Sequence, residues 1–122
     1  MIFTDAEIAY LAEQRLGRLA TIDPNGAPQN NPVGFRYNAE LGTIDVGGHE
    51  LAASRKFHNV QQNGKVAFVV DDLVSVKPWT VRCVEIRGDA DALAEPEVIR
   101  IRPHRIISFG IDPGGRTART VS

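Results

Sequence analysis

The chain has 122 residues, a length that fits one domain and is too short for two independent hydrophobic cores. Hydrophobic residues make up 43% and charged residues 24% of it, which excludes an intrinsically disordered protein. The formal net charge of −1 gives no overall field to attract nucleic acid or an anionic membrane, so a bound anion would need a local cluster of cations. A single cysteine excludes an internal disulfide, and no stretch is long and apolar enough to span a membrane. We therefore expect a cytoplasmic protein.

The first half of the chain predicts one helix followed by three strands. The helix begins with a capping box formed by Thr4 and Glu7, and Gly17 is available to end it. A proline followed by Asn-Gly favours a tight turn over residues 23–26, between extended runs on either side. The strands are predicted over residues 18–23, 27–36 and 43–48.

The second half predicts one more helix and then strands to the end of the fold. Ser54 is a good N-cap for a helix that ends near Gln62. A strongly apolar strand follows, and then a long one that bends near Gly88. Residues 98–111 read as two extended pieces around Pro103, and residues 113–122 lack apolar periodicity and predict a flexible tail. The two strands before these pieces are predicted over residues 65–71 and 80–93.

The whole chain is therefore predicted to be a single mainly β domain with six or seven strands and two short helices. A closed or nearly closed antiparallel barrel would remove the exposed edges of so many strands. The long strand carries Val81 and Cys83 on one face and Val84 and Ile86 on the other. A barrel needs only its inner face apolar, so the second apolar face predicts a homodimer.

The start of the second predicted helix is a candidate phosphate site. Ser54 as N-cap leaves backbone N–H groups unpaired at the positive end of the helix dipole, which favours an anion. Arg55 and Lys56 occupy the first turn, where the dipole disfavours cations, and a bound phosphate would relieve this conflict. The alternative is a pair of solvated surface cations.

Residues 29–34 form a second candidate, because three consecutive amides are poor strand formers. Asn30 and Asn31 precede Pro32, which removes a ladder donor and suits an edge strand, and Val33 follows. A planar heteroaromatic ring could pair with this exposed backbone. The alternative is an irregular edge strand protected by its proline.

Trp79 and Arg82 form a third candidate. Trp79, the only tryptophan, could stack on a ring or pack at a dimer seam. Arg82 lies among apolar neighbours, which suits either an interface or a half-exposed strand with solvated charges. The three histidines have no metal-binding spacing, so we expect no metal site, and no acid pair or triad identifies a catalytic residue. An enzyme with this sequence would take its reactive group from a cofactor.

These landmarks, in order along nearly the whole chain, resemble the pyridoxamine 5'-phosphate oxidase-like FMN-binding split-barrel superfamily. The likeness is greatest to its actinobacterial branch of probable F420-dependent oxidoreductases. It is carried by residues 18–23, 26–33, 54–60, 65–71, 82–88 and 99–112.

The resemblance implies a split β-barrel homodimer with cofactor sites at the subunit interface. The cofactor phosphate would lie against Ser54, Arg55 and Lys56, and the ring would lie along residues 30–33. Trp79 and Arg82 would reach the cofactor from the partner subunit. The connection at residues 95–97 is shorter than the family's usual loop, which implies either a more open pocket or a loop that is missing from the given sequence.

The leading functional hypothesis is an F420 (deazaflavin)-dependent oxidoreductase that transfers a hydride between the cofactor and a small organic acceptor. An FMN-dependent oxidoreductase is the first alternative, and a non-catalytic flavin or deazaflavin carrier is the second. Neither nucleic acid nor a membrane is an expected partner. The anionic tail of F420 would need a further basic groove, for which the candidates are Lys77, Arg100, Arg102 and Arg105.

Overall fold

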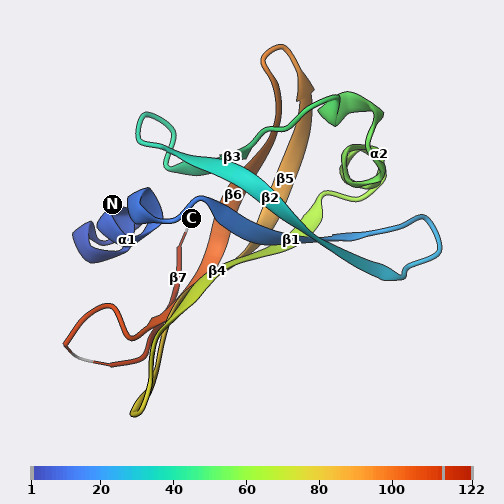
Figure 1. Cartoon of the computed structure of the whole chain (residues 1–122). Coiled ribbons are helices and arrows are strands. Elements are labelled where there is room, and N and C mark those ends of the chain that lie inside the picture. Colours follow the sequence, from blue (N-terminus) through green and yellow to red (C-terminus); the bar gives the residue numbers. More distant parts are fainter. Residues whose placement is uncertain (1, 114, 122) are drawn as a thin grey trace.

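The protein is mainly β with two α-helices, in a computed structural model that describes residues 2–113 and 115–121. Its strands are all antiparallel and form a seven-stranded sheet in the order β3-β2-β1-β4-β5-β6-β7, in which β3 also pairs with β6 (Figure 1). The elements are α1 (Asp5–Glu13), β1 (Leu16–Ile22), β2 (Pro28–Asn38), β3 (Thr43–Val46), the 3-10 turn η1 (Leu51–Ala53), α2 (Arg55–Gln62), β4 (Lys65–Val76), β5 (Trp79–Ala94), β6 (Glu97–Phe109) and β7 (Thr117–Thr120).

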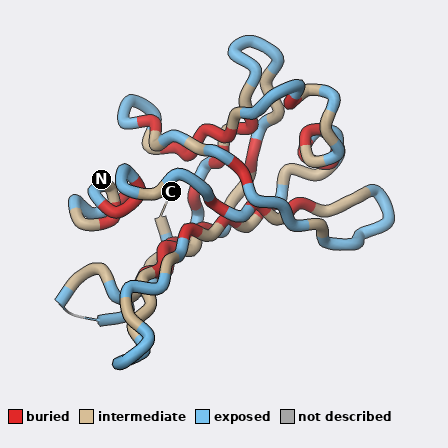
Figure 2. Tube along the Cα trace, viewed as in Figure 1, coloured by how far each residue is buried: buried red, intermediate tan, exposed pale blue. Residues whose placement is uncertain are grey.

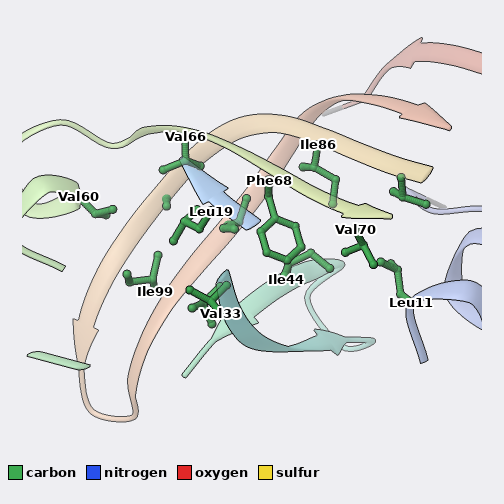
Figure 3. Packing of buried hydrophobic residues seen from close by; sticks show 14 of the residues in the cluster. Leu11, Leu19, Val33, Ile44, Val60, Val66, Phe68, Val70, Ile86 and Ile99 are labelled. Carbon is green, nitrogen blue, oxygen red and sulfur yellow. The ribbon is translucent and has the colours of Figure 1, made fainter. Parts of the chain in front are cut away.

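The core lies between the strands, and both helices contribute residues to it. The two helices lie far apart, α1 at the left and α2 at the upper right of Figure 1. Buried segments run along the middles of the strands, whereas the hairpin tips are exposed (Figure 2). Phe68 on β4 lies among Leu19, Val33, Ile44 and Ile86 from four other strands (Figure 3). No described helix has the length and apolar character needed to cross a membrane.

The predicted start of α1 is confirmed, but its predicted end is wrong. The Thr4 hydroxyl accepts a hydrogen bond from the Glu7 backbone N–H, and the Glu7 carboxylate accepts one from the Thr4 N–H. The helix nevertheless ends at Glu13, and Gly17 lies inside β1. Gly17 is needed there for space, because a Cβ at this position would stand 2.2 Å from the Phe68 ring.

Replacing Gly17 with alanine should therefore destabilise the fold. Phe68 is 1% exposed and has no room to move away from an added methyl group, so the strain falls on the packed core. Overpacking of this kind costs about 1–3 kcal/mol. Urea denaturation of G17A would measure the loss. Gly34→Ala is the matched control, because no atom of the chain lies within 4 Å of the position of its added Cβ. Equal stability of the two variants would contradict the packing argument.

The later strands confirm one prediction and correct another. The β5–β6 register shifts between Arg87 and Gly88, as expected of a strand that bends near Gly88. Pro103 does not divide the following segment, because β6 is one continuous strand. Pro103 pairs with Gly88 at the irregularity, where the ladder already tolerates a missing N–H.

The prediction of a flexible tail over residues 113–122 is wrong for its central part, and residues 114 and 122 lie outside the described residues. Residues 117–120 form β7, which pairs with β6 from Ser108 to Arg105. Arg119 donates hydrogen bonds to the fully buried Glu7 carboxylate at 2.6 and 2.9 Å. A long-range ion pair, which local periodicity does not report, therefore fixes this segment against α1.

Candidate functional site

The start of α2 has the geometry predicted for anion binding. Ser54 is the N-cap, and its hydroxyl accepts from the Phe57 N–H at 3.3 Å and donates to the Leu51 carbonyl at 2.6 Å. The Ser54 hydroxyl is thus engaged in the cap. The backbone N–H groups of Arg55 and Lys56 have no hydrogen-bond partner in the described part of the chain. These two N–H groups are the ones available to a ligand.

The side chains of the first turn of α2 also lack acidic partners. Among the described residues, neither Arg55 nor Lys56 takes part in an ion pair, and no acidic residue lies in the first turn. Arg55 is exposed and Lys56 half-buried. The two cations and the two free N–H groups together form a positive site that nothing else in this part of the chain neutralises. This donor set fits a phosphate group.

The β2 segment predicted to face a ring is an open strand edge. β2 pairs with β1 over residues 28–34, but with β3 only from Phe35 to Asn38. The backbone side of residues 28–34 that faces away from β1 therefore has no strand partner in the sheet. Asn30, Asn31 and Pro32 are exposed, whereas Val33 points into the core at 5% exposure. The predicted edge strand is confirmed, and Val33 can offer a ligand only its backbone.

A buried amide connects α2 with this open edge. Asn59, 1% exposed and one helical turn after Lys56, donates to the Thr21 hydroxyl at 3.0 Å and to the side-chain amide oxygen of Gln29 at 2.8 Å. Gln29 directly precedes Asn30. Asn59 thus holds α2, which carries the phosphate candidate, against β2, which carries the ring candidate. Nothing in the sequence spacing identified this contact, because 30 residues separate its two ends.

The outer face beside the open edge is hollowed and has an apolar floor. Asn30 lines a hollow of about 320 Å³ together with Ala20, Ala67 and Val69 from β1 and β4. Arg18 and Glu85 also line it. A flat organic group would find apolar contacts below it and polar groups at its edge, as is usual in small-molecule sites.

Trp79 and Arg82 lie far from α2 within one chain. β4 starts three residues after α2 and runs away from it over 12 residues, or roughly 40 Å at the rise of an extended strand. Trp79 follows the turn at the far end of β4 and is 71% exposed, so that the β4–β5 hairpin tip and α2 lie at opposite ends of the molecule (Figure 1). Within one chain, Trp79 and Arg82 therefore do not lie near the phosphate candidate on α2.

Arg82 is held by neighbours in its own chain. Its guanidinium donates to both Asp72 carboxylate oxygens at 3.0 and 2.7 Å, and to Glu13 at 3.3 Å. It also lies 4.9 Å from the centre of the Tyr10 ring, whose hydroxyl donates to Asp72. The hydrogen bond to Asp72 raises the pKa of Arg82, and the same bond lowers the pKa of Asp72. This cluster fixes α1 against the β4–β5 hairpin.

Within one chain, Lys77 lies apart from the three arginines suggested for an anionic cofactor tail. Lys77 lies in the turn at the tip of the β4–β5 hairpin, whereas the three arginines lie on β6. Arg100 donates twice to Asp45 at 3.0 Å, and Arg102 is paired with Asp91. Two of the four suggested cations are therefore paired with acidic residues of neighbouring strands.

Comparisons with known proteins agree with this architecture. The model of the family described as pyridoxamine 5'-phosphate oxidase matches residues 3–106. A 5a,11a-dehydrotetracycline/5a,11a-dehydrooxytetracycline reductase from Streptomyces rimosus is 46% identical, over 92% of this chain and 86% of the relative. The solved structure of a conserved hypothetical protein, Rv2991 from Mycobacterium tuberculosis, aligns with a TM-score of 0.72 at 23% identity, covering 98% of this chain and 92% of the other. The structure of an F420 reductase aligns with a TM-score of 0.56 at 22% identity, covering 73% of this chain and 86% of the other.

Proposed function

Because the chain belongs to the pyridoxamine 5'-phosphate oxidase family, we propose that it is an F420-dependent oxidoreductase acting on an organic acceptor. The observation that carries the proposal is the pair of unneutralised cations, Arg55 and Lys56, at the start of a helix tied to an open strand edge. When bound, the cofactor would supply a hydride. An acceptor double bond would take up that hydride and one proton from water.

In this proposal the start of α2 holds the cofactor phosphate. The free N–H groups of Arg55 and Lys56 point out of the helix, and their side chains add two charges. Ser54 contributes by capping the helix, which keeps those N–H groups aligned. The roles of the three residues therefore differ: Ser54 positions the site, and the two cations bind.

The open edge of β2 supports binding of the ring. Alternate residues of an antiparallel strand direct their N–H and C=O groups to opposite sides. Pro28 and Pro32 have no N–H to donate to β1. Residues 28, 30 and 32 are therefore expected to direct their backbone groups away from β1. Over residues 28–32 that side then presents three carbonyls and the Asn30 N–H. A flavin or deazaflavin ring, with its alternating donors and acceptors, can pair with such an edge.

The acceptor is proposed to be a flat polycyclic compound. The Streptomyces rimosus relative is named for the reduction of dehydrotetracyclines, and its 46% identity extends over 92% of this chain. The apolar floor of the hollow beside Asn30 is compatible with such a molecule. The protein's own part is to exclude water and to orient the acceptor, because the candidate site offers no paired acid and base.

A split-barrel homodimer is the proposed assembly. A register shift between Leu73 and Ser75 places Val76 and Trp79 on the same outer face as Leu73 and Val81. Val76 is 63% and Trp79 71% exposed, and this apolar stripe continues to the nearly buried Cys83 outside the main core. A second copy would cover the stripe and could bring Trp79 to a cofactor on its neighbour.

The dimer proposal predicts that the stripe controls the molecular mass in solution. V76S/W79S should run as a monomer of 13.3 kDa, whereas the wild-type chain should have twice that mass. Both residues are highly exposed in one chain, so the variant should keep its fold. Size-exclusion chromatography with light scattering measures the mass. Leu41→Ser is the control, because Leu41 is 52% exposed but follows β2, away from the hairpin. A dimeric V76S/W79S would exclude this stripe as the interface.

A fluorescence titration with F420 and, separately, with FMN tests the proposed function. Micromolar or tighter binding of F420 alone supports it, and reduced F420 should then lose its hydride to a dehydrotetracycline acceptor. A preference for FMN would assign the chain to the FMN-dependent alternative with the same site residues. A bound cofactor that never exchanges electrons would favour the carrier alternative. Binding of neither cofactor would overturn all three.

A further inference from the structure

The side chain of Asn59 is buried with one of its two polar atoms unpaired. It is 1% exposed, and its nitrogen donates one hydrogen bond to the Thr21 hydroxyl and one to the side-chain oxygen of Gln29. Its oxygen, Oδ1, has no hydrogen-bond partner, which is true of no other buried side-chain nitrogen or oxygen in the described part of the chain. Burying an unpaired acceptor costs free energy, so stability alone does not explain this amide.

An apolar residue would serve the packing of α2 better than this amide. Phe57 and Val60, the other buried residues near Asn59 on the helix, belong to the hydrophobic core. Asparagine is also a poorer helix former than leucine, which has a side chain of similar shape. Apolar contacts are non-directional, however, and they do not fix how a helix slides or turns on a sheet. Hydrogen bonds require a defined length and angle, so the amide supplies what the apolar contacts lack.

The two acceptors of the Asn59 amide are a matched pair. Thr21 on β1 and Gln29 on β2 are directly opposite each other in the ladder, so their side chains lie on the same face of the sheet. One amide therefore bonds to two adjacent strands at the same level, which fixes both the position and the rotation of α2. Thr21 is 1% exposed and Gln29 is half-buried, so these bonds are largely shielded from competing water.

The same amide lies between the two halves of the proposed cofactor site. Along α2, Arg55 and Lys56 come four and three residues before Asn59, about 6 and 4.5 Å at the rise of an α-helix. Along β2, Asn30 directly follows Gln29 and belongs to the edge proposed to bind the ring. The spacing between the phosphate donors and the ring edge is thus set by two side chains that bond to each other inside the protein.

We propose that Asn59 is a positioning residue, which acts through Gln29 to hold the phosphate-binding start of α2 at the correct distance from the ring-binding edge of β2. The proposal rests on the proposed function and adds to it a residue that does not contact the cofactor. A ligand that carries both a ring and a phosphate gains affinity because binding of one part raises the effective concentration of the other. This gain is lost when the spacing of the two subsites no longer matches the ligand.

A double-mutant cycle of Gln29→Met with Arg55→Ala tests the proposal, with cofactor affinity measured by fluorescence titration with F420 and with FMN. Gln29→Met keeps the length of the side chain and removes its amide oxygen. It should weaken binding of the cofactor that the wild-type chain prefers about tenfold. Arg55→Ala should weaken binding roughly ten- to a hundredfold in the wild-type background, but less than about threefold in the Gln29→Met background, because the two subsites no longer cooperate.

Thr21→Val is the matched control. It removes the other hydrogen bond of the Asn59 amide and leaves the bond to Gln29 in place. The thermal midpoints of Gln29→Met and Thr21→Val should fall by similar amounts, because each variant loses one hydrogen bond of the same kind. Thr21→Val should nevertheless keep cofactor affinity within about twofold of the wild type, since the link between α2 and β2 is retained.

Each other result contradicts a defined part. No loss of affinity in Gln29→Met, or an equal loss in Thr21→Val, would mean that the amide only stabilises the fold. Fully additive effects of Gln29→Met and Arg55→Ala would make Gln29 an independent cofactor contact, which overturns the positioning role and leaves the proposed function standing. If the wild-type chain binds neither F420 nor FMN, the proposed function fails, and the role of Asn59 fails with it.

Discussion

Alanine at Arg55 or Lys56 should weaken cofactor binding roughly ten- to a hundredfold. Charge-assisted hydrogen bonds contribute about 1.5–3 kcal/mol each, and about 1.4 kcal/mol corresponds to a factor of ten in the dissociation constant. Neither side chain has an acidic partner in the described chain, so its charge is free to act on the phosphate. Fluorescence titration with F420 and with FMN measures the effect.

The phosphate assignment has two further consequences. Riboflavin, which has the FMN ring without its phosphate, should bind wild-type and R55A protein about equally if it binds at all. Arg15→Ala is a matched control, because Arg15 is an exposed cation in the link between α1 and β1. Folding should be unaffected in R55A, because the side chain is exposed. An unchanged F420 affinity in both R55A and K56A would place the phosphate elsewhere.

Alanine at Arg119 should destabilise the protein by about 3–5 kcal/mol at neutral pH, the usual cost of breaking a buried ion pair. Glu7 is fully buried and accepts from Arg119, from the Ser108 hydroxyl at 2.9 Å and from the Thr4 N–H. Without the guanidinium its carboxylate would stay buried without a countercharge. Arg119 also donates to the Ile2 carbonyl at 2.7 Å, so the change loosens α1 and β7 together.

The loss in R119A should depend on pH in a defined direction. Burial alone raises the pKa of Glu7, but the hydrogen bonds from Arg119, Thr4 and Ser108 outweigh it and hold the pKa below its usual value. A carboxyl with a depressed folded-state pKa contributes stability above its unfolded pKa and loses it as the pH falls through the folded value. In R119A only the hydrogen bonds from Thr4 and Ser108 remain to oppose burial, so the pKa of Glu7 should rise. The difference in stability between wild type and R119A should therefore be largest at neutral pH and should shrink below about pH 4.5.

Urea denaturation at a series of pH values measures this difference. Arg105→Ala removes another arginine of the β6–β7 region, one whose partner is the exposed Thr120 hydroxyl, and it should cost less than about 1 kcal/mol. R119A should also expose β7 to proteolysis, since its link to α1 is lost. A loss of stability in R119A that equals that in R105A, or that does not vary with pH, would contradict a buried ion pair.

Features that short-range hydrogen bonds define could be predicted from the sequence alone. The capping box at Thr4, the cap at Ser54 and the turn at residues 23–26 were all predictable, and Asp23 indeed accepts from the Asn25 and Ala27 N–H groups at 2.9 Å. The start of α2 and the edge character of residues 30–32 followed from the same local chemistry. These groups interact within a few residues, so their pattern is visible in one dimension.

Which of these local features meet is set by the tertiary structure. It placed Gly17 against Phe68, kept Pro103 within one strand and fixed residues 117–120 through Arg119 and Glu7. It also set Thr21 opposite Gln29 and tied α2 to β2 through Asn59. Each of these depends on strand register or on a buried polar contact between distant segments. Such contacts form only when the whole sheet has chosen one pairing, and composition and periodicity do not encode that choice locally.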